Sequence, residues 1–411
     1  MTIFDVFLYL SIIVGFFMAF NLGGNDVANS MASAVGAKAI TVKQAVVIAG
    51  TLSFVGAVFL GSHVTATISK GIIRPELIPD PKIIMIGMFS SLLAAGFWVF
   101  IATLTALPVS STHSIVGSML GFGLAAGGIS TVNWWVLGGV VLSWVVSPFF
   151  AATLSYLIFT HIKKLILDRT EFILQTMRWA PVWVALTFAL ILLSFSYKTP
   201  IGKEVNLPWW IPLIATFVIC LLIYVLVRLI ICKKLAGKVK KAENVELIFR
   251  RMQILTSCYV ALSHGANDVA NAIGPVVAVY VIAKQHVFLS EASVPMPILV
   301  LGGLGISTGI ALFGSKVIAT VGEKITRLNN TRGFSVDFGA ATTILFASKL
   351  GLPVSSTHSV VGGVVGVGLA RGFKAVDFGI LGKIFIYWIL TVPIAAFTTI
   401  LIFNILKAII F

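Results

Sequence analysis

The sequence carries very little charge for its length. Only 10% of its 411 residues are Asp, Glu, Lys or Arg, whereas soluble globular proteins contain about 25%. Apolar residues make up 58% of the chain, and its mean hydropathy is +1.06. A soluble protein of this composition would need an apolar core far larger than this chain can cover with polar surface. We therefore exclude the soluble classes.

Acidic residues and cysteines are scarce, with 14 Asp and Glu against 29 Lys and Arg, and only three Cys. Cys220, Cys232 and Cys258 have no metal-ligand spacing, so they indicate neither a zinc site nor a disulfide framework. The sequence also lacks a polar domain that could present basic residues to nucleic acid, and we expect no such partner. No basic leader precedes the first apolar run, which we interpret as a retained helix.

Long apolar runs fill most of the chain. A helix needs about 20 apolar residues to cross a bilayer. The plainest runs of about this length are 83–104, 134–159, 181–197, 209–231 and 376–406. We predict an all-α polytopic membrane protein of the cell (inner) membrane, in contact with lipid.

Two short polar motifs interrupt the apolar sequence, and each occurs twice. Residues 23–29 read GGNDVAN and residues 265–271 read GANDVAN; we call these the NDVAN motifs. Residues 107–113 and 352–358 both read LPVSSTH; we call these the SSTH motifs. Because duplicated polar breaks in a membrane protein mark a site at the junction of two repeats, we expect the four motifs to meet.

The order of the motifs divides the chain into a first repeat, 1–159, a basic segment, 160–251, and a second repeat, 252–411. The basic segment holds 14 of the 29 Lys and Arg and contains two apolar runs. Since basic residues mark cytoplasmic segments, we expect its flanks in the cytoplasm and the N-terminus, which has no basic residue before Lys38, outside. The two repeats would then enter the membrane from opposite faces as an inverted repeat.

The NDVAN motifs offer hard oxygen ligands in an apolar setting. An ionised Asp at mid-membrane costs about 2.5–3.5 kcal/mol, and Asp26 and Asp268 are the only two acids that we find embedded in strongly apolar helix-forming sequence. Carboxylate and amide oxygens suit a cation such as Na⁺. The alternative is a helix cap or an interhelical hydrogen bond. The predicted sodium ligands are Asp26, Asp268, Asn25, Asn29, Asn267 and Asn271.

The SSTH motifs indicate an anion site. Pro108 and Pro353 can each start a new helix, and the hydroxyl residues that follow are favoured at helix N-termini, where N–H groups and a partial positive charge attract a tetrahedral oxyanion. The alternative is back-bonding within ordinary helices. The candidate anion-binding residues are Ser110, Ser111, Thr112, Ser355, Ser356 and Thr357. His113 and His358 end the motifs, and we expect them to hold a neighbouring hydroxyl or carbonyl, or to donate to the anion.

In these motifs the sequence resembles the inorganic phosphate transporter family of sodium- or proton-coupled phosphate permeases, and the similarity covers both repeats. The resemblance implies that the anion is phosphate and that Asn25, Asp26, Asn267 and Asp268 take part in ion and substrate binding. It also implies a homodimer of subunits with about twelve membrane helices. The prolines and glycines of the SSTH segments suit broken or re-entrant helices among them. The central segment lacks the large soluble insert of some animal relatives.

Charge decides the expected coupling. Phosphate brings about one to two negative charges, two aspartates bring two more, and the motifs contain no Lys or Arg. Two helix N-termini supply only about +0.5 each. We therefore predict about two Na⁺ ions beside phosphate, cooperative binding, and secondary active symport by alternating access.

Four other functions are compatible with parts of the sequence. Sulfate is also tetrahedral, and protons could drive symport of phosphate or of a metal–phosphate complex. A passive anion channel is disfavoured because anion pores use Arg or Lys rings. An enzyme with a Ser nucleophile and a His base is disfavoured because neither SSTH motif contains an orienting carboxylate.

Overall fold

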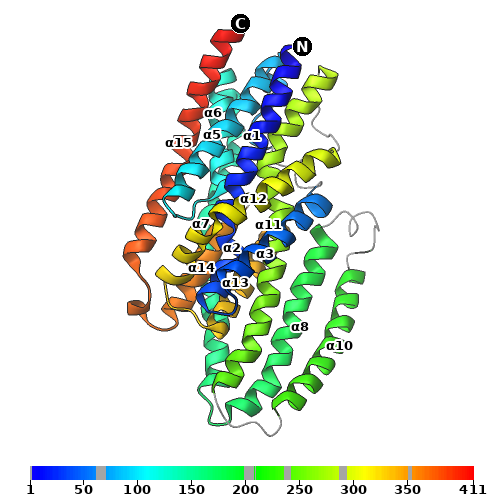
Figure 1. Cartoon of the computed structure of the whole chain (residues 1–411), viewed down its shortest axis with the longest axis vertical. Helices are drawn as coiled ribbons and strands as arrows, with labels where there is room; N and C mark the ends of the chain where they lie inside the picture. Colours follow the sequence, from blue (N-terminus) through cyan, green and yellow to red (C-terminus); the bar gives the residue numbers. More distant parts are fainter. Residues whose placement is uncertain are drawn as a thin grey trace.

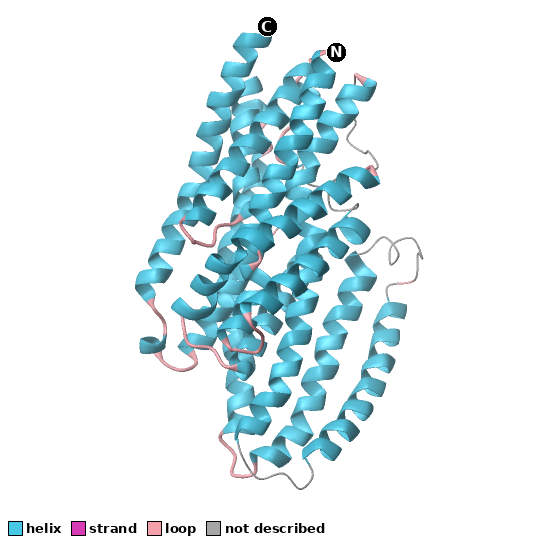
Figure 2. Cartoon of the chain, viewed as in Figure 1, coloured by secondary structure: helices cyan, strands magenta, loops and turns pink. Residues whose placement is uncertain are grey.

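The structure is a computed structural model that describes residues 2–61, 71–198, 208, 210–235, 242–286, 294–349 and 354–411. Within these ranges nearly all regular structure is helical, apart from a single β-bridge between Ile73 and Val132 (Figure 2). Ten helices in the described ranges are long and apolar enough to cross a membrane. The predicted all-α polytopic membrane fold is confirmed.

Six main helices lie in the described residues of the first part of the chain, 2–61 and 71–159. These are α1 (Ile3–Asp26), α2 (Ala28–Gly36), α3 (Val42–Leu60), α5 (Pro81–Leu104), α6 (Ser111–Gly127) and α7 (Trp134–Ile162). Local sequence signals account for two of these helix starts. Thr41 and Gln44 form a capping box at the start of α3, and Asp80 is the N-cap of α5, just before Pro81.

Where the structure describes it, the later part of the chain has a similar order of helices, with a difference at its first helix. Its helices are α11 (Ala242–Gln285), α12 (Met296–Ala319), α13 (Asn330–Lys349), α14 (Ser356–Leu369) and α15 (Phe378–Ile410). Helix α11 is one continuous helix where the first part has the broken pair α1 and α2. Two long helices, α8 (Phe172–Lys198) and α10 (Trp210–Leu235), lie between the two sets.

The helices of the two sets interleave. Helix α1 packs against α12 while α3 packs against α11, and α7 packs against α14 while α6 packs against α15. Glycines of the NDVAN motifs permit two of these approaches. A Cβ atom on Gly23 would lie 2.0 Å from the Ile306 carbonyl oxygen, and one on Gly265 would lie 2.0 Å from that of Ser53. These glycines therefore let the helices approach closely.

The first helices of the two sets, α1 and α11, run in opposite directions along the long axis of the molecule (Figure 1). Helix α1 starts at the end where both termini lie, whereas α11 starts at the other end. The end of α7, the start of α8, the end of α10 and the start of α11 gather at that second end. The basic flanks of the central segment are therefore far from the N-terminus.

Candidate functional site

The first NDVAN motif lies at a break between two helices. Helix α1 ends at Asp26, α2 starts at Ala28, and the Val27 carbonyl accepts a 3.1 Å hydrogen bond from the Ser30 hydroxyl. The break places the carboxylate of Asp26 and the amide of Asn29 in the interior, where Asp26 is 1% exposed and Asn29 is 3% exposed. The second NDVAN motif stays helical within α11. There Pro275 lacks the N–H that would bond the Asn271 carbonyl.

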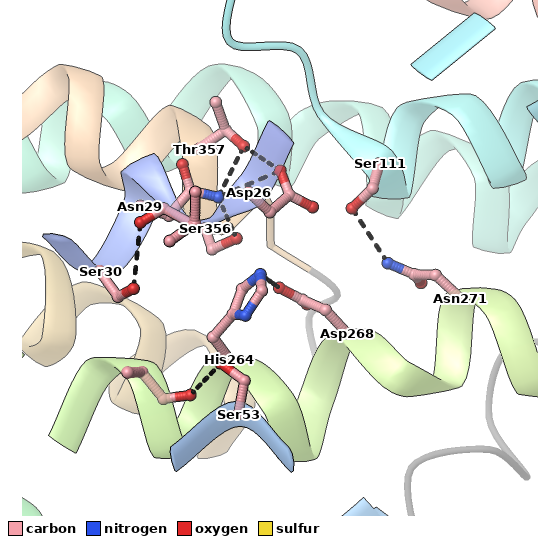
Figure 3. A network of polar contacts seen from close by, with 12 residues as sticks. Asp26, Asn29, Ser30, Ser53, Ser111, His264, Asp268, Asn271, Ser356 and Thr357 are labelled. Carbon is pink, nitrogen blue, oxygen red and sulfur yellow. Dashed lines mark hydrogen bonds and ion pairs between the residues drawn. The ribbon is translucent and has the colours of Figure 1, made fainter. Parts of the chain in front are cut away.

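Each NDVAN motif contacts the SSTH motif of the other half of the chain. The Asn29 amide nitrogen lies 3.1 Å from the Ser356 hydroxyl and 3.0 Å from the Thr357 hydroxyl at the start of α14. The Asn271 amide donates to the Ser111 hydroxyl at the start of α6, at 3.3 Å (Figure 3). This exchange of partners explains why the motifs occur in pairs.

Asp26 lies at the centre of the contact between the first NDVAN motif and the start of α14. Its Oδ1 accepts from the Asn29 amide at 3.3 Å and from the Thr357 hydroxyl at 3.3 Å. Its Oδ2 is buried and has no hydrogen-bond donor among the described residues. A buried carboxylate oxygen without a donor is stabilised when it binds a cation or a hydrogen-bond donor of a substrate.

The two aspartates meet, although they are far apart in sequence. One carboxylate oxygen each of Asp26 and Asp268 and one ring nitrogen of His264 lie within 4.8 Å of one another. His264 and Asp268 share α11, with Nε2 and Oδ2 at 3.2 Å (Figure 3). His264 has no duplicate at the matching position of the first half, so the repeated motifs do not point to it. Its position four residues before Asp268, on the same helix face, was the available signal.

The SSTH motifs form two helix N-termini. Ser110 is the N-cap of α6 and accepts from the His113 amide at 3.2 Å; Ser355 is the N-cap of α14 and accepts from the His358 amide at 3.3 Å. The expected capping role of these serines is confirmed. Both Ser110 and Ser355 are 1% exposed, and Thr112 in the first turn of α6 is half-buried. Pro353 lies outside the described residues.

The Asn25 amide has a bracing role in this structure. Its Nδ2 lies 3.2 Å from the Thr103 hydroxyl and 3.1 Å from the Leu107 carbonyl oxygen, and its Oδ1 accepts from the Val109 amide at 3.0 Å. These contacts hold the connection between α5 and α6 beside α1. Ion or phosphate binding by Asn25 stays a prediction, as it does for Asn267, which is half-buried. The corresponding connection before α14 includes residues 350–353, which lie outside the described residues.

The two motif histidines connect α6 and α14 to the tryptophans of α7 and α15. His113 stacks on Trp144 with ring centroids 3.6 Å apart, and His358 stacks on Trp388 at 3.7 Å. Each ring then reaches the carbonyl of the other tryptophan: His358 Nδ1 lies 3.0 Å from the Trp144 oxygen, and His113 Nδ1 lies 3.4 Å from the Trp388 oxygen. Both histidines therefore hold a carbonyl, as one of the predicted roles requires.

One buried acid contradicts the sequence interpretation. Asp337 in α13 is 2% exposed, although we had found only Asp26 and Asp268 embedded in apolar helical sequence. Its Oδ2 accepts from the Ser257 hydroxyl at 2.6 Å, and its Oδ1 accepts from the Ser33 hydroxyl. The serines come from α11 and α2, so the sequence near Asp337 could not reveal that its carboxylate is satisfied.

Comparison with known proteins identifies the family. The model of the phosphate transporter family matches residues 22–399. A protein of Thermococcus kodakarensis that is named as a phosphate permease is 48% identical over 99% of both chains. The inorganic phosphate transporter 2-1, chloroplastic, of Arabidopsis thaliana is 38% identical over 94% of this chain and 70% of its own length.

A solved structure, entitled the sodium-dependent phosphate transporter, matches with a TM-score of 0.90 and 46% identity, over 98% of this chain and 100% of that one. Family, fold and buried polar centre agree, and they confirm the resemblance found in the sequence. The chain belongs to the phosphate transporter family and is a multi-pass membrane transporter rather than an enzyme.

Proposed function

We propose that the protein carries inorganic phosphate together with sodium, by exposing one central site to the two sides of the membrane in turn. The observation that carries the proposal is the meeting of Asp26 and Asp268, with ligand atoms within 4.8 Å, beside the N-termini of α6 and α14. The site combines buried negative charge with anion-attracting helix ends, and both parts come from both halves of the chain.

Sodium fits the acidic part of this centre. Asp26 and its neighbours Asn29 and Thr357 carry carboxylate, amide and hydroxyl oxygens, which are the ligands that a hard cation prefers. The unpartnered Oδ2 of Asp26 offers a ready ligand atom. We assign sodium binding to the two aspartates and to the side-chain oxygens of the NDVAN asparagines Asn25, Asn29, Asn267 and Asn271.

Phosphate fits the helix ends. Ser110 and Ser355 cap α6 and α14, which leaves the next residues of each first turn to present hydroxyl and backbone N–H groups. Ser111 and Ser356 already contact the asparagines of the opposite NDVAN motif. We assign phosphate binding to the hydroxyls of Ser110, Ser111, Thr112, Ser355, Ser356 and Thr357, with Asn25 and Asn267 beside them.

Electrostatics couples the two cargoes. Two aspartates and phosphate would place three to four negative charges in a buried centre, and two helix N-termini offset only about one of them. About two sodium ions would remove most of the remainder, so each cargo lowers the electrostatic cost of binding the other.

The arrangement of the halves supports the proposal of alternating access. The chain presents matched helices in opposite directions (Figure 1), and their interleaved contacts support an inverted repeat whose halves, 1–159 and 252–411, rock about the centre. The basic ends of the central segment 160–251 favour a cytoplasmic location, which places the N-terminus outside the cell membrane. The family resemblance supports a homodimer. Because the centre lies within one chain, each subunit would transport on its own.

Uptake of labelled phosphate into liposomes tests the proposal. Removing one carboxylate charge about 4 Å from sodium costs about 4 kcal/mol at an effective dielectric constant of about 20, which is about a thousandfold in affinity. Asp26→Asn and Asp268→Asn should each abolish sodium-driven uptake, while Asp168→Asn, which changes an exposed acid near the end of α7, should not. Full transport by either centre variant would refute the proposal.

A proton gradient is the alternative driving force, for phosphate or for a metal–phosphate complex. The sodium-dependent name of the matching structure favours sodium. Liposomes with a sodium gradient alone and with a proton gradient alone separate the two. Uptake driven only by protons would transfer the proposal to proton symport.

A further inference from the structure

A histidine outside both motifs completes a three-ligand cluster around the paired aspartates. His264 precedes Asp268 by one turn of α11, and ligand atoms of these two residues and Asp26 lie within 4.8 Å of one another. All three residues are buried: Asp26 is 1% exposed, His264 4% and Asp268 9%. They come from two halves of the chain, so only the folded molecule contains the cluster.

The cluster is not symmetric between the halves. The residue four positions before Asp26 is Leu22, whereas the residue four positions before Asp268 is His264. Sodium prefers oxygen ligands, so an imidazole adds little to a sodium site. An imidazole nitrogen is, however, a good ligand for divalent transition metals, which also accept carboxylate oxygen.

We propose that Asp26, His264 and Asp268 bind a divalent transition-metal ion of the Zn²⁺ type, and that the bound ion excludes sodium and stops phosphate transport. Zinc binds His nitrogen and carboxylate oxygen at about 2.0–2.2 Å, which places neighbouring ligand atoms about 3–4 Å apart. Ligand atoms within 4.8 Å reach this arrangement through shifts of about 1 Å. One imidazole and two carboxylates leave open positions for water.

The present contacts of the cluster favour an added ion. Asp26 Oδ2 and His264 Nδ1 are buried and have no hydrogen-bond partner among the described residues. The ion would therefore use at least one carboxylate oxygen that now lacks a donor. The Asp268 side chain is 12% exposed against 1% for His264, so Asp268 is the more accessible of these two ligands.

Charge makes the metal and sodium mutually exclusive. One divalent ion neutralises both aspartates, as two sodium ions would, and it occupies the same carboxylates. This step rests on the proposed assignment of Asp26 and Asp268 to sodium. Metal binding itself does not depend on it, so the two proposals can fail separately.

The test measures binding of Zn²⁺ to the purified full-length protein by calorimetry, in buffer free of sodium and phosphate. Wild type should bind one ion per chain, and added sodium should weaken the apparent affinity. His264→Leu, which installs the residue found at the matching position of the first half, should lower the affinity at least tenfold. His161→Leu, which removes an exposed histidine, should leave it unchanged.

Zinc-edge X-ray absorption on wild type alone keeps the proposal testable if His264→Leu does not fold. It should show one imidazole with oxygen ligands, and a shell of oxygen only overturns the proposal. Wild-type affinity in a folded His264→Leu variant also overturns it, whereas binding indifferent to sodium overturns only the exclusion of sodium and leaves the metal site standing. Sodium-driven uptake by wild type should fall as Zn²⁺ is added and recover at higher sodium. If metal binds through His264 but wild type shows no sodium-driven uptake, the proposed function fails and the metal site stands.

Discussion

Asn29 and Asn271 occupy equivalent positions in the two NDVAN motifs, yet the structure predicts that they contribute unequally. The Asn29 amide nitrogen contacts the Asp26 carboxylate and two hydroxyls of α14, at 3.0–3.3 Å. The Asn271 amide donates to the Ser111 hydroxyl alone among the described residues, at 3.3 Å. Truncating Asn29 therefore removes a bond to a charged group, whereas truncating Asn271 removes a neutral one.

The expected magnitudes follow from these contacts. A hydrogen bond to a charged group contributes about 1.5–3 kcal/mol and a neutral one about 0.5–1.5 kcal/mol. An amide group has only two N–H donors, so Asn29→Ala loses one bond of each kind, about 2–4.5 kcal/mol in all. Asn271→Ala loses about 0.5–1.5 kcal/mol. Asn29→Ala should therefore shift the unfolding equilibrium about tenfold or more further toward the unfolded state than Asn271→Ala does.

Two measurements on matched variants check this difference. Thermal melting of the purified proteins should place Asn29→Ala clearly below Asn271→Ala, and the KM of phosphate uptake should rise more in Asn29→Ala. Asn29→Gln, which retains the amide on a longer side chain, should recover part of the loss. Equal effects of the two alanine variants, or a larger effect at Asn271, would refute the reasoning from these contacts.

Two further predictions concern a helix contact and a hydrogen bond. Gly265→Ala should destabilise the protein by about 1–3 kcal/mol, because its Cβ atom would meet the Ser53 carbonyl oxygen at 2.0 Å. Gly138→Ala, where a Cβ atom would meet nothing within 4 Å, should have the melting temperature of wild type, and equal melting of the two variants would contradict the close approach of α3 and α11. Trp388→Phe should lower stability by about 0.5–1.5 kcal/mol, because it removes the 3.2 Å bond from Nε1 to the Pro108 carbonyl; a melting temperature equal to that of wild type would show that this bond does not stabilise the start of α6.

Much of the site was predictable because its signals are local. Ser110 and Ser355 act as N-caps as their position after a Pro predicts, because capping depends only on the next three residues. Asp26 and Asp268 stood out because a carboxylate in apolar sequence is costly wherever the chain folds. Asp337 gave no such local signal, because the serines that donate to its carboxylate are 80 and 304 residues away in sequence.

The sequence by itself determined the membrane environment, the all-α class and the two motif pairs, since bilayer thickness and backbone hydrogen bonding leave a hydrophobic chain few alternatives. Only the tertiary structure decided which motif meets which. The contact of Thr357 with Asp26 spans 331 residues, and it exists because helices of one half pack between those of the other. The same packing decided that His264 joins the paired aspartates, because a cluster drawn from distant segments depends on where their helices cross and leaves no local pattern.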